Sequence, residues 1–124
     1  MIIKQVTVIV ENKEGKLKEV MDVLAAHEIN VEALSMADTH DRLIVENPEK
    51  TKEILEDYGY EVYLTDVISV KVPNKVGALA HMLVSIADAK INLEYMYAYS
   101  DVSGKMIICP SDVIKANELL SDWE

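Results

Sequence analysis

Basic residues and cysteine are scarce in this 124-residue chain, and each scarcity excludes a class of protein. The 12 lysines and arginines are outnumbered by 22 aspartates and glutamates, so the formal net charge is −10. Because nucleic acids and anionic membranes bind to basic surfaces, we expect neither as a partner. The single cysteine, Cys109, excludes an internal disulfide and favours a reducing compartment, which predicts a cytoplasmic protein.

Segments and motifs typical of membrane proteins and of common enzymes are missing as well. The N-terminal apolar run is short and alternating, and Lys4 and Gln5 interrupt it, which predicts neither a signal peptide nor a membrane span. The sequence contains no P-loop, no dinucleotide-binding fingerprint and no Ser/His/Asp order. Asp38, His40 and Asp41 are interpreted as the polar tip of a hairpin. We therefore expect no catalytic residues, no metal and no cofactor.

The chain does contain an internal repeat with a period of 62 residues, half its length. Residues 8–32 and 70–94 align without gaps. Ten of these 25 positions are identical: Val8/Val70, Val10/Val72, Asn12/Asn74, Lys13/Lys75, Gly15/Gly77, Leu17/Leu79, Ala25/Ala87, Ile29/Ile91, Asn30/Asn92 and Glu32/Glu94. Self-similarity at a fixed period indicates a structural unit that is built twice.

The first repeat alternates between strand-like and helix-like patterns. β-Branched alternation over 2–10 predicts a strand, and Asn12 is interpreted as the N-cap of the helix that follows. Both repeats give that helix an apolar stripe at helical spacing: Leu17, Val20, Met21 and Leu24, and Leu79, Met82, Leu83 and Ile86. We then expect strands at 29–36 and 43–45, and a second helix that ends at a left-handed Gly59.

Residues 60–72 alternate without a glycine or proline, so the last strand of the first repeat runs nearly directly into the first strand of the second. The second repeat ends after a helix at about 111–123, without a final strand. We predict an α+β fold of two tandem ferredoxin-like βαββαβ units with antiparallel sheets, covering 1–65 and 66–124, with seven strands in total. The missing strand leaves one sheet edge open, and this predicts a homodimer, since exposed edges pair with other chains.

Two short motifs resemble the strand-to-helix signature of the ACT domain, whose usual form is Asp/Asn-x-Pro-Gly-x-Leu. They are Asn12-Lys13-Glu14-Gly15-Lys16-Leu17 and Asn74-Lys75-Val76-Gly77-Ala78-Leu79. The whole chain is similar to small tandem ACT proteins, although Glu14 and Val76 replace the family's proline. Glu28 and Lys90 stand where the family often has a glycine before Ile-Asn, so both are expected to adopt a left-handed conformation at a cost of about 1 kcal/mol.

This resemblance implies a non-enzymatic regulatory module that binds a free amino acid near the strand-to-helix turns, at the repeat interface, and acts on a separate partner protein. Helix N-termini attract a carboxylate, glycines let a ligand approach the backbone, and asparagines can donate and accept hydrogen bonds. The candidate ligand-binding residues are Asn12, Glu14, Gly15, Lys16, Leu17 and Asn30 in the first repeat, and Asn74, Val76, Gly77, Ala78, Leu79 and Asn92 in the second.

Other interpretations of the same residues stay open. Each glycine can serve only to let the helix pack on the strand, and each asparagine can serve only the local backbone. The chain can also be a ligand-free protein–protein assembly module or, less readily, an acylphosphatase-like enzyme. That enzyme chemistry needs an arginine in the loop after the first strand, whereas the only arginine, Arg42, falls in a predicted hairpin.

Overall fold

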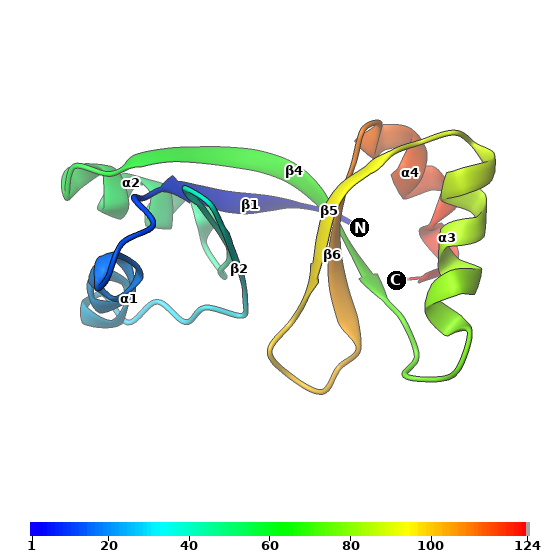
Figure 1. Ribbon diagram of the computed structural model, residues 1–124, viewed down its shortest axis with the longest axis horizontal. Coiled ribbons are helices and arrows are strands. Elements are labelled where there is room, and N and C mark those ends of the chain that lie inside the picture. The colour runs from blue at the N-terminus through cyan, green and yellow to red at the C-terminus, as the bar shows by residue number, and fades with distance from the viewer. Residues whose placement is uncertain (124) are drawn as a thin grey trace. The chain divides into compact units, whose positions relative to one another are not determined.

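The computed structural model describes residues 1–123 and forms two compact units. The first unit is Lys4–Thr65, and the second combines Met1–Ile3 with the chain from Asp66 onward. In chain order the elements are β1 (Ile2–Ile9), α1 (Lys16–Ala26), β2 (Ala33–Ala37), β3 (His40–Ile44), α2 (Pro48–Asp57), β4 (Glu61–Lys71), α3 (Ala78–Asp88), β5 (Leu93–Ala98), β6 (Lys105–Pro110), α4 (Val113–Leu119) and a 3₁₀ turn (Ser121–Trp123). Figure 1 labels these elements, and in each unit the two helices lie on the same side of the strands. Among the described helices, none is both long and apolar enough to cross a membrane.

The strands pair antiparallel in the order β2-β3-β1-β4-β6-β5, and β1 and β4 contribute to both units. In the first unit β3 lies between β1 and β2, with Leu43 opposite Val6 of β1. In the second unit β6 lies between β4 and β5, with Ile108 opposite Ile68 of β4. The same strand arrangement therefore occurs twice, and the predicted α+β fold of two ferredoxin-like units is confirmed.

The expected number of seven strands is wrong, and the reason lies in β4. The alternation over 60–72 predicts two strands that nearly join, but in the structure they form one continuous strand of 11 residues. The boundary between the units falls inside this strand, between Thr65 and Asp66. No glycine or proline is present there to end the strand, so it runs on from one unit into the next. Within residues 1–123 the protein thus has six strands rather than seven.

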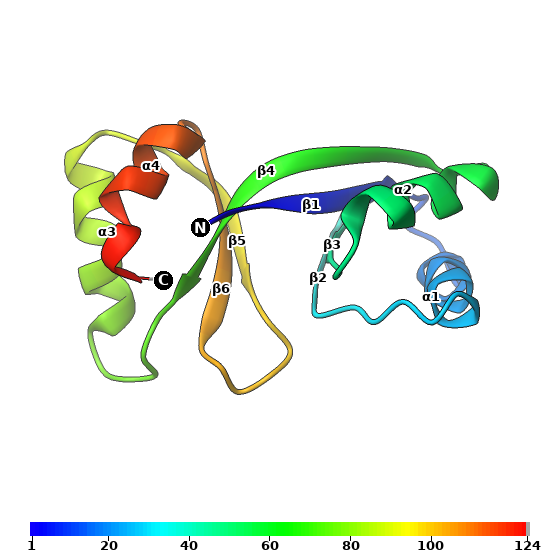
Figure 2. The same cartoon turned by 180° about the vertical axis from the view of Figure 1, so that it is seen from behind.

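The N-terminal residues occupy the position of the strand that the second repeat lacks. The Met1 amino group donates to the Ser69 carbonyl oxygen at 3.1 Å, and the Ser69 N–H donates to the Met1 carbonyl oxygen at 2.9 Å. Figure 2 shows this end of the chain beside β4. The predicted open edge is therefore wrong, because Met1–Ile3 belong to the second unit and fill it. The homodimer stays a prediction that has lost this support, and the edge strands are β2 and β5.

Each unit has its own hydrophobic core, and the two cores use equivalent positions. The first core consists of Val6, Val8, Val10, Val20, Leu24, Leu43, Val45, Leu55 and Val62. The second consists of Ile68, Val70, Val72, Met82, Ile86, Ile108, Ala116 and Leu120. Complete burial of an aliphatic side chain contributes about 1.5–3 kcal/mol, so the predicted stripes hold α1 and α3 against their strands. Cys109 of β6 is buried as well.

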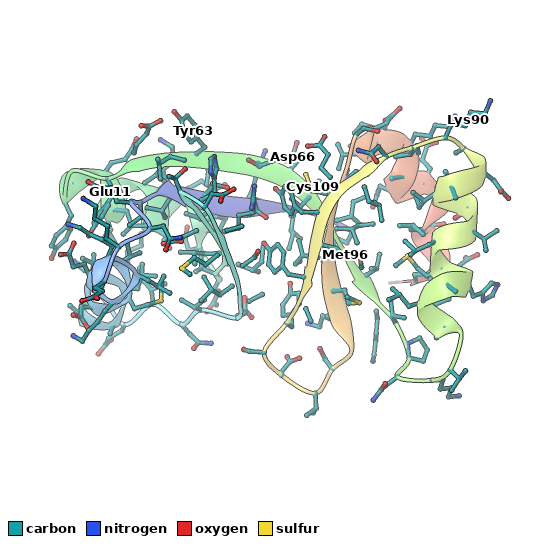
Figure 3. The ribbon with its side chains drawn as sticks, in the orientation of Figure 1. Glu11, Tyr63, Asp66, Lys90, Met96 and Cys109 are labelled. Atoms are coloured by element: carbon teal, nitrogen blue, oxygen red, sulfur yellow. The ribbon has the colours of Figure 1, made fainter. Side chains whose placement is uncertain are left out.

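A residue with a left-handed backbone conformation follows each of the equivalent helices α1 and α3. Glu28 has a φ of 56° and Lys90 a φ of 59°, which confirms the expectation for these two positions. Figure 3 labels Lys90 where the chain leaves α3. Gly59, after α2, has a φ of 93°, also as predicted. A third non-glycine residue, Asp38 with a φ of 52°, lies in the turn between β2 and β3.

Candidate ligand-binding sites

The α-helices of residues 1–123 begin in two different ways. α2 and α4 have side-chain caps: Asn47 Oδ1 accepts from the Lys50 N–H at 3.1 Å, and Asp112 Oδ1 accepts from the Lys115 N–H at 3.0 Å. α1 and α3 instead follow a glycine and have no side-chain cap. The starts of α1 and α3 therefore keep N–H groups that an external anion can bind.

Asn12 is not the N-cap that the sequence suggests. α1 begins only at Lys16, and its N-cap is Gly15. Before the helix the chain makes one more tight turn, in which the Lys16 N–H donates to the Lys13 carbonyl oxygen at 3.2 Å. The second unit makes the same turn, from Ala78 N–H to the Lys75 carbonyl oxygen at 3.2 Å. Asn12 is thus left exposed in the loop, free of a capping role.

Gly15 and Gly77 are required by backbone conformation and not by packing. Their φ angles are 77° and 82°, a region that favours glycine. A Cβ added at either position would have no heavy atom within 4 Å. The interpretation that these glycines let the helix pack on the strand is therefore wrong. The open space beside them instead leaves the backbone accessible from outside.

A small pocket of about 210 Å³ lies between the loop before α1 and the β2–β3 hairpin of the first unit. Its lining residues are Val10, Glu11, Asn12, Lys13, Gly15, Leu17, Lys18, Met36, Asp38 and Asp41. Figure 3 labels Glu11 in the loop that leads from β1 to α1. Of the candidate residues, the structure brings Asn12, Gly15 and Leu17 together here. Glu14 and Lys16 belong to the same turn but are not among the lining residues.

The second unit has an equivalent pocket of about 430 Å³. It is lined by Val72, Pro73, Asn74, Lys75, Leu79, Ala98, Tyr99, Asp101, Val102, Gly104, Lys105 and Met106. Asn74 and Leu79 are the candidate residues that it brings together. Val76, Gly77 and Ala78 lie in the adjoining turn, where Val76 is fully exposed, and they do not line this pocket.

The two remaining candidates, Asn30 and Asn92, lie apart from these pockets within their own units. Asn30 lines a separate pocket of about 280 Å³ with residues from the end of α1 and the start of α2, including His27 and Asn47. The Asn92 N–H donates to Ser111 Oγ at 3.1 Å, and the Ser111 N–H donates to the Asn92 carbonyl oxygen at 2.8 Å. Asn92 thus serves the local backbone through its main chain, and a ligand-binding role for either asparagine stays a prediction.

Sequence reasoning missed Asp41. The polar turn is Asp38–Thr39, and Asp41 lies inside β3, where it is only 2% exposed. Its Oδ2 atom is buried and has no hydrogen-bond partner among the described residues. Burial raises the pKa of the Asp41 carboxyl above its usual range. The sequence does contain a sign of this burial. Asp41 and Leu43 are two residues apart, so in a strand both side chains point to the same face, which is the face of the core.

The lysines that line the same pocket are paired with other carboxylates. Lys13 Nζ lies 2.9 Å from Glu11 Oε2, and Lys18 Nζ lies 2.7 Å from Asp22 Oδ2. Over residues 1–123, no group of three or more His, Cys, Asp and Glu side chains is arranged to hold a metal ion. The pocket therefore combines an uncapped helix start with one buried carboxylate.

Comparison with known proteins identifies the family. The model of the ACT domain pair matches residues 1–121. The solved structure of protein BT0572 from Bacteroides thetaiotaomicron is 36% identical, with a TM-score of 0.91, and the match covers 98% of this chain and 88% of that one. No curated protein matches this chain in sequence.

More distant solved structures share the fold. The regulatory subunit of aspartate kinase from Thermus thermophilus, in its ligand-free form, is 16% identical with a TM-score of 0.67, and the match covers 100% of this chain and 95% of that one. E. coli aspartokinase III in complex with lysine and aspartate is 14% identical with a TM-score of 0.59, and the match covers 96% of this chain but 29% of that one. Since the family model spans nearly the whole sequence, this chain belongs to the ACT domain family, as a pair of ACT domains.

Proposed function

We propose that this ACT domain pair is a non-catalytic regulatory module that binds a free, small amino acid at the starts of α1 and α3. One observation carries the proposal: in both units an uncapped helix start adjoins a pocket, whereas α2 and α4 have side-chain caps. The positive end of the helix dipole and the free N–H groups suit the carboxylate that every amino acid carries.

The size and lining of the first pocket favour a small ligand with an apolar side chain. Its volume, about 210 Å³, is below the roughly 300–1,000 Å³ of pockets that bury drug-sized molecules. Val10, Leu17 and Met36 supply apolar surface. The neighbouring structure of E. coli aspartokinase III holds lysine and aspartate, which supports amino-acid binding as a use of this fold without naming the amino acid bound here.

Regulation requires a second protein, and we propose a cytoplasmic partner together with homodimerisation. The proposed dimer uses the edge strand β2, where Leu34 is 39% and Met36 50% exposed. The same exposed side chains support the alternative of a ligand-free assembly module. An acylphosphatase-like activity has less support, because Arg42 lies in β3 and the loop between β1 and α1 contains no arginine.

A thermal-shift screen of the twenty amino acids at millimolar concentration tests amino-acid binding. We expect at least one small apolar amino acid to raise the melting temperature, because binding only to the folded state stabilises it. Backbone amide signals of Leu17 and Leu79, at the two helix starts, should move in the same titration. If no amino acid changes either readout, the regulatory proposal fails and the assembly module replaces it.

A further inference from the structure

The register of the two sheets identifies Asp41 and Met106 as equivalent positions. Asp41 of β3 lies opposite Val8 of β1, and Met106 of β6 lies opposite Val70 of β4. Val8 and Val70 are themselves a matched pair of the sequence repeat. Asp41 lines the pocket of the first unit and Met106 that of the second. At this position the carboxylate of the first pocket is thus replaced by a thioether in the second.

Asp41 is costly for the unliganded protein. A buried polar atom without a partner loses its hydrogen bonds to water and gains none in return, and a buried charge costs more. Asp41 is 2% exposed, and its Oδ2 has no partner among the described residues. The lysines of the pocket do not compensate it, because Lys13 and Lys18 pair with Glu11 and Asp22.

A cation in the pocket would supply the missing partner, and the pocket favours an ammonium group over a metal ion. Calcium takes six to eight oxygen ligands and magnesium an octahedral set, whereas the described residues include no cluster of acidic or imidazole side chains suited to a metal. An ammonium group needs only a few acceptors, since it carries three N–H donors. The same pocket is also lined by Gly15 and Leu17, at the uncapped start of α1, which attracts an anion.

We propose that Asp41 is the hydrogen-bond acceptor for the ligand's ammonium group. The first unit therefore selects zwitterionic amino acids, whereas the second, with Met106, binds carboxylates whether or not they carry an amine. This inference rests on the proposed function and assigns the two halves of a zwitterion to two parts of one pocket. The carboxylate binds at the start of α1 and the ammonium group at Asp41. The second pocket retains the uncapped helix start but has Met106 in place of the buried carboxylate, and its own carboxylate, Asp101, is exposed and accepts a hydrogen bond from the Ser103 N–H.

The test compares amino acids with acids that differ only in the amine. The probes are L-alanine, L-valine and L-leucine, and their deaminated counterparts propionate, isovalerate and 4-methylpentanoate. Backbone amide shifts of the ¹⁵N-labelled full chain give separate affinities, with Leu17 reporting on the first unit and Leu79 on the second. We expect the first unit to prefer the amino acid at least about tenfold, the worth of one hydrogen bond to a charged group, and the second unit to show no preference.

Asp41→Asn keeps the shape of the side chain and removes its charge. It should lower amino-acid affinity in the first unit at least about tenfold, leave the affinity for the deaminated acids unchanged, and leave the second unit unaffected. Asp38→Asn is the matched control, because Asp38 is an exposed carboxylate of the same pocket. A melting temperature of Asp41→Asn at or above that of the parent excludes a merely structural role for the carboxylate.

The outcomes separate this inference from the proposed function. If an amino acid binds the parent and Asp41→Asn equally well, Asp41 is not the ammonium acceptor, although the regulatory proposal survives. The same conclusion follows if the deaminated acids bind the first unit as tightly as the amino acids. If none of the six probes moves the amides of either unit, and the twenty-amino-acid screen is also negative, both proposals are overturned together.

Discussion

The first and second units share their strand order and core positions, but they differ in the hairpin that borders each pocket. Leu43 follows its partner Val6 by 37 residues, whereas Ile108 follows its partner Ile68 by 40, so the second hairpin is three residues longer. The pockets differ accordingly, at about 210 Å³ and 430 Å³. Packing therefore constrains the core of a duplicated unit more strongly than the hairpin, which is free to diversify the site.

The carboxylates of the two hairpins differ in the same way. Asp101, in the longer hairpin, is exposed and accepts hydrogen bonds from the Ser103 N–H at 3.0 Å and from Ser103 Oγ at 2.5 Å. These bonds hold the pKa of Asp101 below its usual range, whereas burial raises that of Asp41. Asp101 thus stabilises its own turn, while the Oδ2 atom of Asp41 has no hydrogen-bond partner among the described residues.

Removal of Met1–Ile3 should have the largest effect on stability, and it should separate the units. These residues belong to the second unit, where Ile2 packs against the core and Met1 pairs with Ser69. Losing two hydrogen bonds and a half-buried isoleucine should cost about 2–4 kcal/mol. Amide exchange at Ile68 should accelerate far more than at Leu43. Equal acceleration at both would mean that the units unfold as one.

Ile2→Ala is the control for this truncation. It keeps the backbone pairing between Met1 and Ser69 and shortens only the side chain that contacts the second core. A smaller loss of stability than in the truncated chain is therefore expected. If the two variants are equally destabilised, the backbone pairing contributes nothing measurable and the N-terminal strand acts only through Ile2.

Gly15→Val and Gly77→Val should abolish binding one unit at a time. A β-branched residue fits poorly at a φ near 80°, and non-glycine residues pay about 1–2 kcal/mol there even without branching. The new side chain would also project into the open space where we propose that the ligand approaches the helix start. Amide titrations of both variants measure binding, with circular dichroism melting as the folding control. Unchanged amino-acid binding in both folded variants would place the ligand elsewhere.

The helices differ in whether a side chain caps their first turn, and removing the capping side chains tests that difference. Asn47→Ala and Asp112→Ala should each lower stability by about 1 kcal/mol, because each cap satisfies a first-turn N–H group. Asn12→Ala and Asn74→Ala should stay within about 0.5 kcal/mol of the parent, because neither asparagine caps a helix. Urea unfolding of the four variants measures these changes in stability. Comparable losses in all four would contradict the assignment of α1 and α3 as uncapped.

The sequence predicts the repeated fold because the features that encode it are local. The helical stripe that includes Val20 and Leu24, and the positive φ of Glu28 and Lys90, follow from spacing and from the family's turn pattern. Two features could not be predicted in this way. Nothing in the alternation over 60–72 distinguishes one long strand from two, and only tertiary pairing reveals that Met1 completes the second unit.

The site was harder to predict than the fold. The glycine motif indicates where the first helix of each repeat begins, but the interpretation of Asn12 as an N-cap is wrong, because the N-caps are the left-handed Gly15 and Gly77. The interpretation of Asp41 as a turn residue is wrong, because the gap-free match ends at residue 32 and does not reveal the three-residue difference between the hairpins. Aligning Leu43 with Ile108 instead would have placed Asp41 opposite an apolar position, Met106, and marked it as a carboxylate in the core pattern.

Asp41→Asn should stabilise the unliganded protein at neutral pH, against the usual cost of changing a buried residue. Because burial raises the pKa of folded Asp41, the folded state binds more protons than the unfolded state above the ordinary aspartate pKa of 3.8. The stability of the parent therefore falls as the pH rises through this window, up to the raised pKa, and the asparagine variant lacks that slope. Urea unfolding of both chains across this pH range measures the difference. Parallel curves would mean that Asp41 is ionised without cost.

The smallest expected effect tests whether the two units are equivalent where they look most alike. Glu28 and Lys90 occupy the same left-handed position after α1 and α3, with φ angles of 56° and 59°. Replacing either residue by glycine removes a backbone strain of about 1–2 kcal/mol but raises the conformational entropy of the unfolded chain. Each variant should therefore be more stable than the parent by about 0.5–1 kcal/mol. Glu53→Gly, at an exposed position inside α2, is the control and should lose about 1 kcal/mol. Differential melting curves measure all three. Equal gains in stability at both positions would show that this turn is equally strained in the two units. A gain at one position alone would show that the units differ in this turn as well as at their pockets.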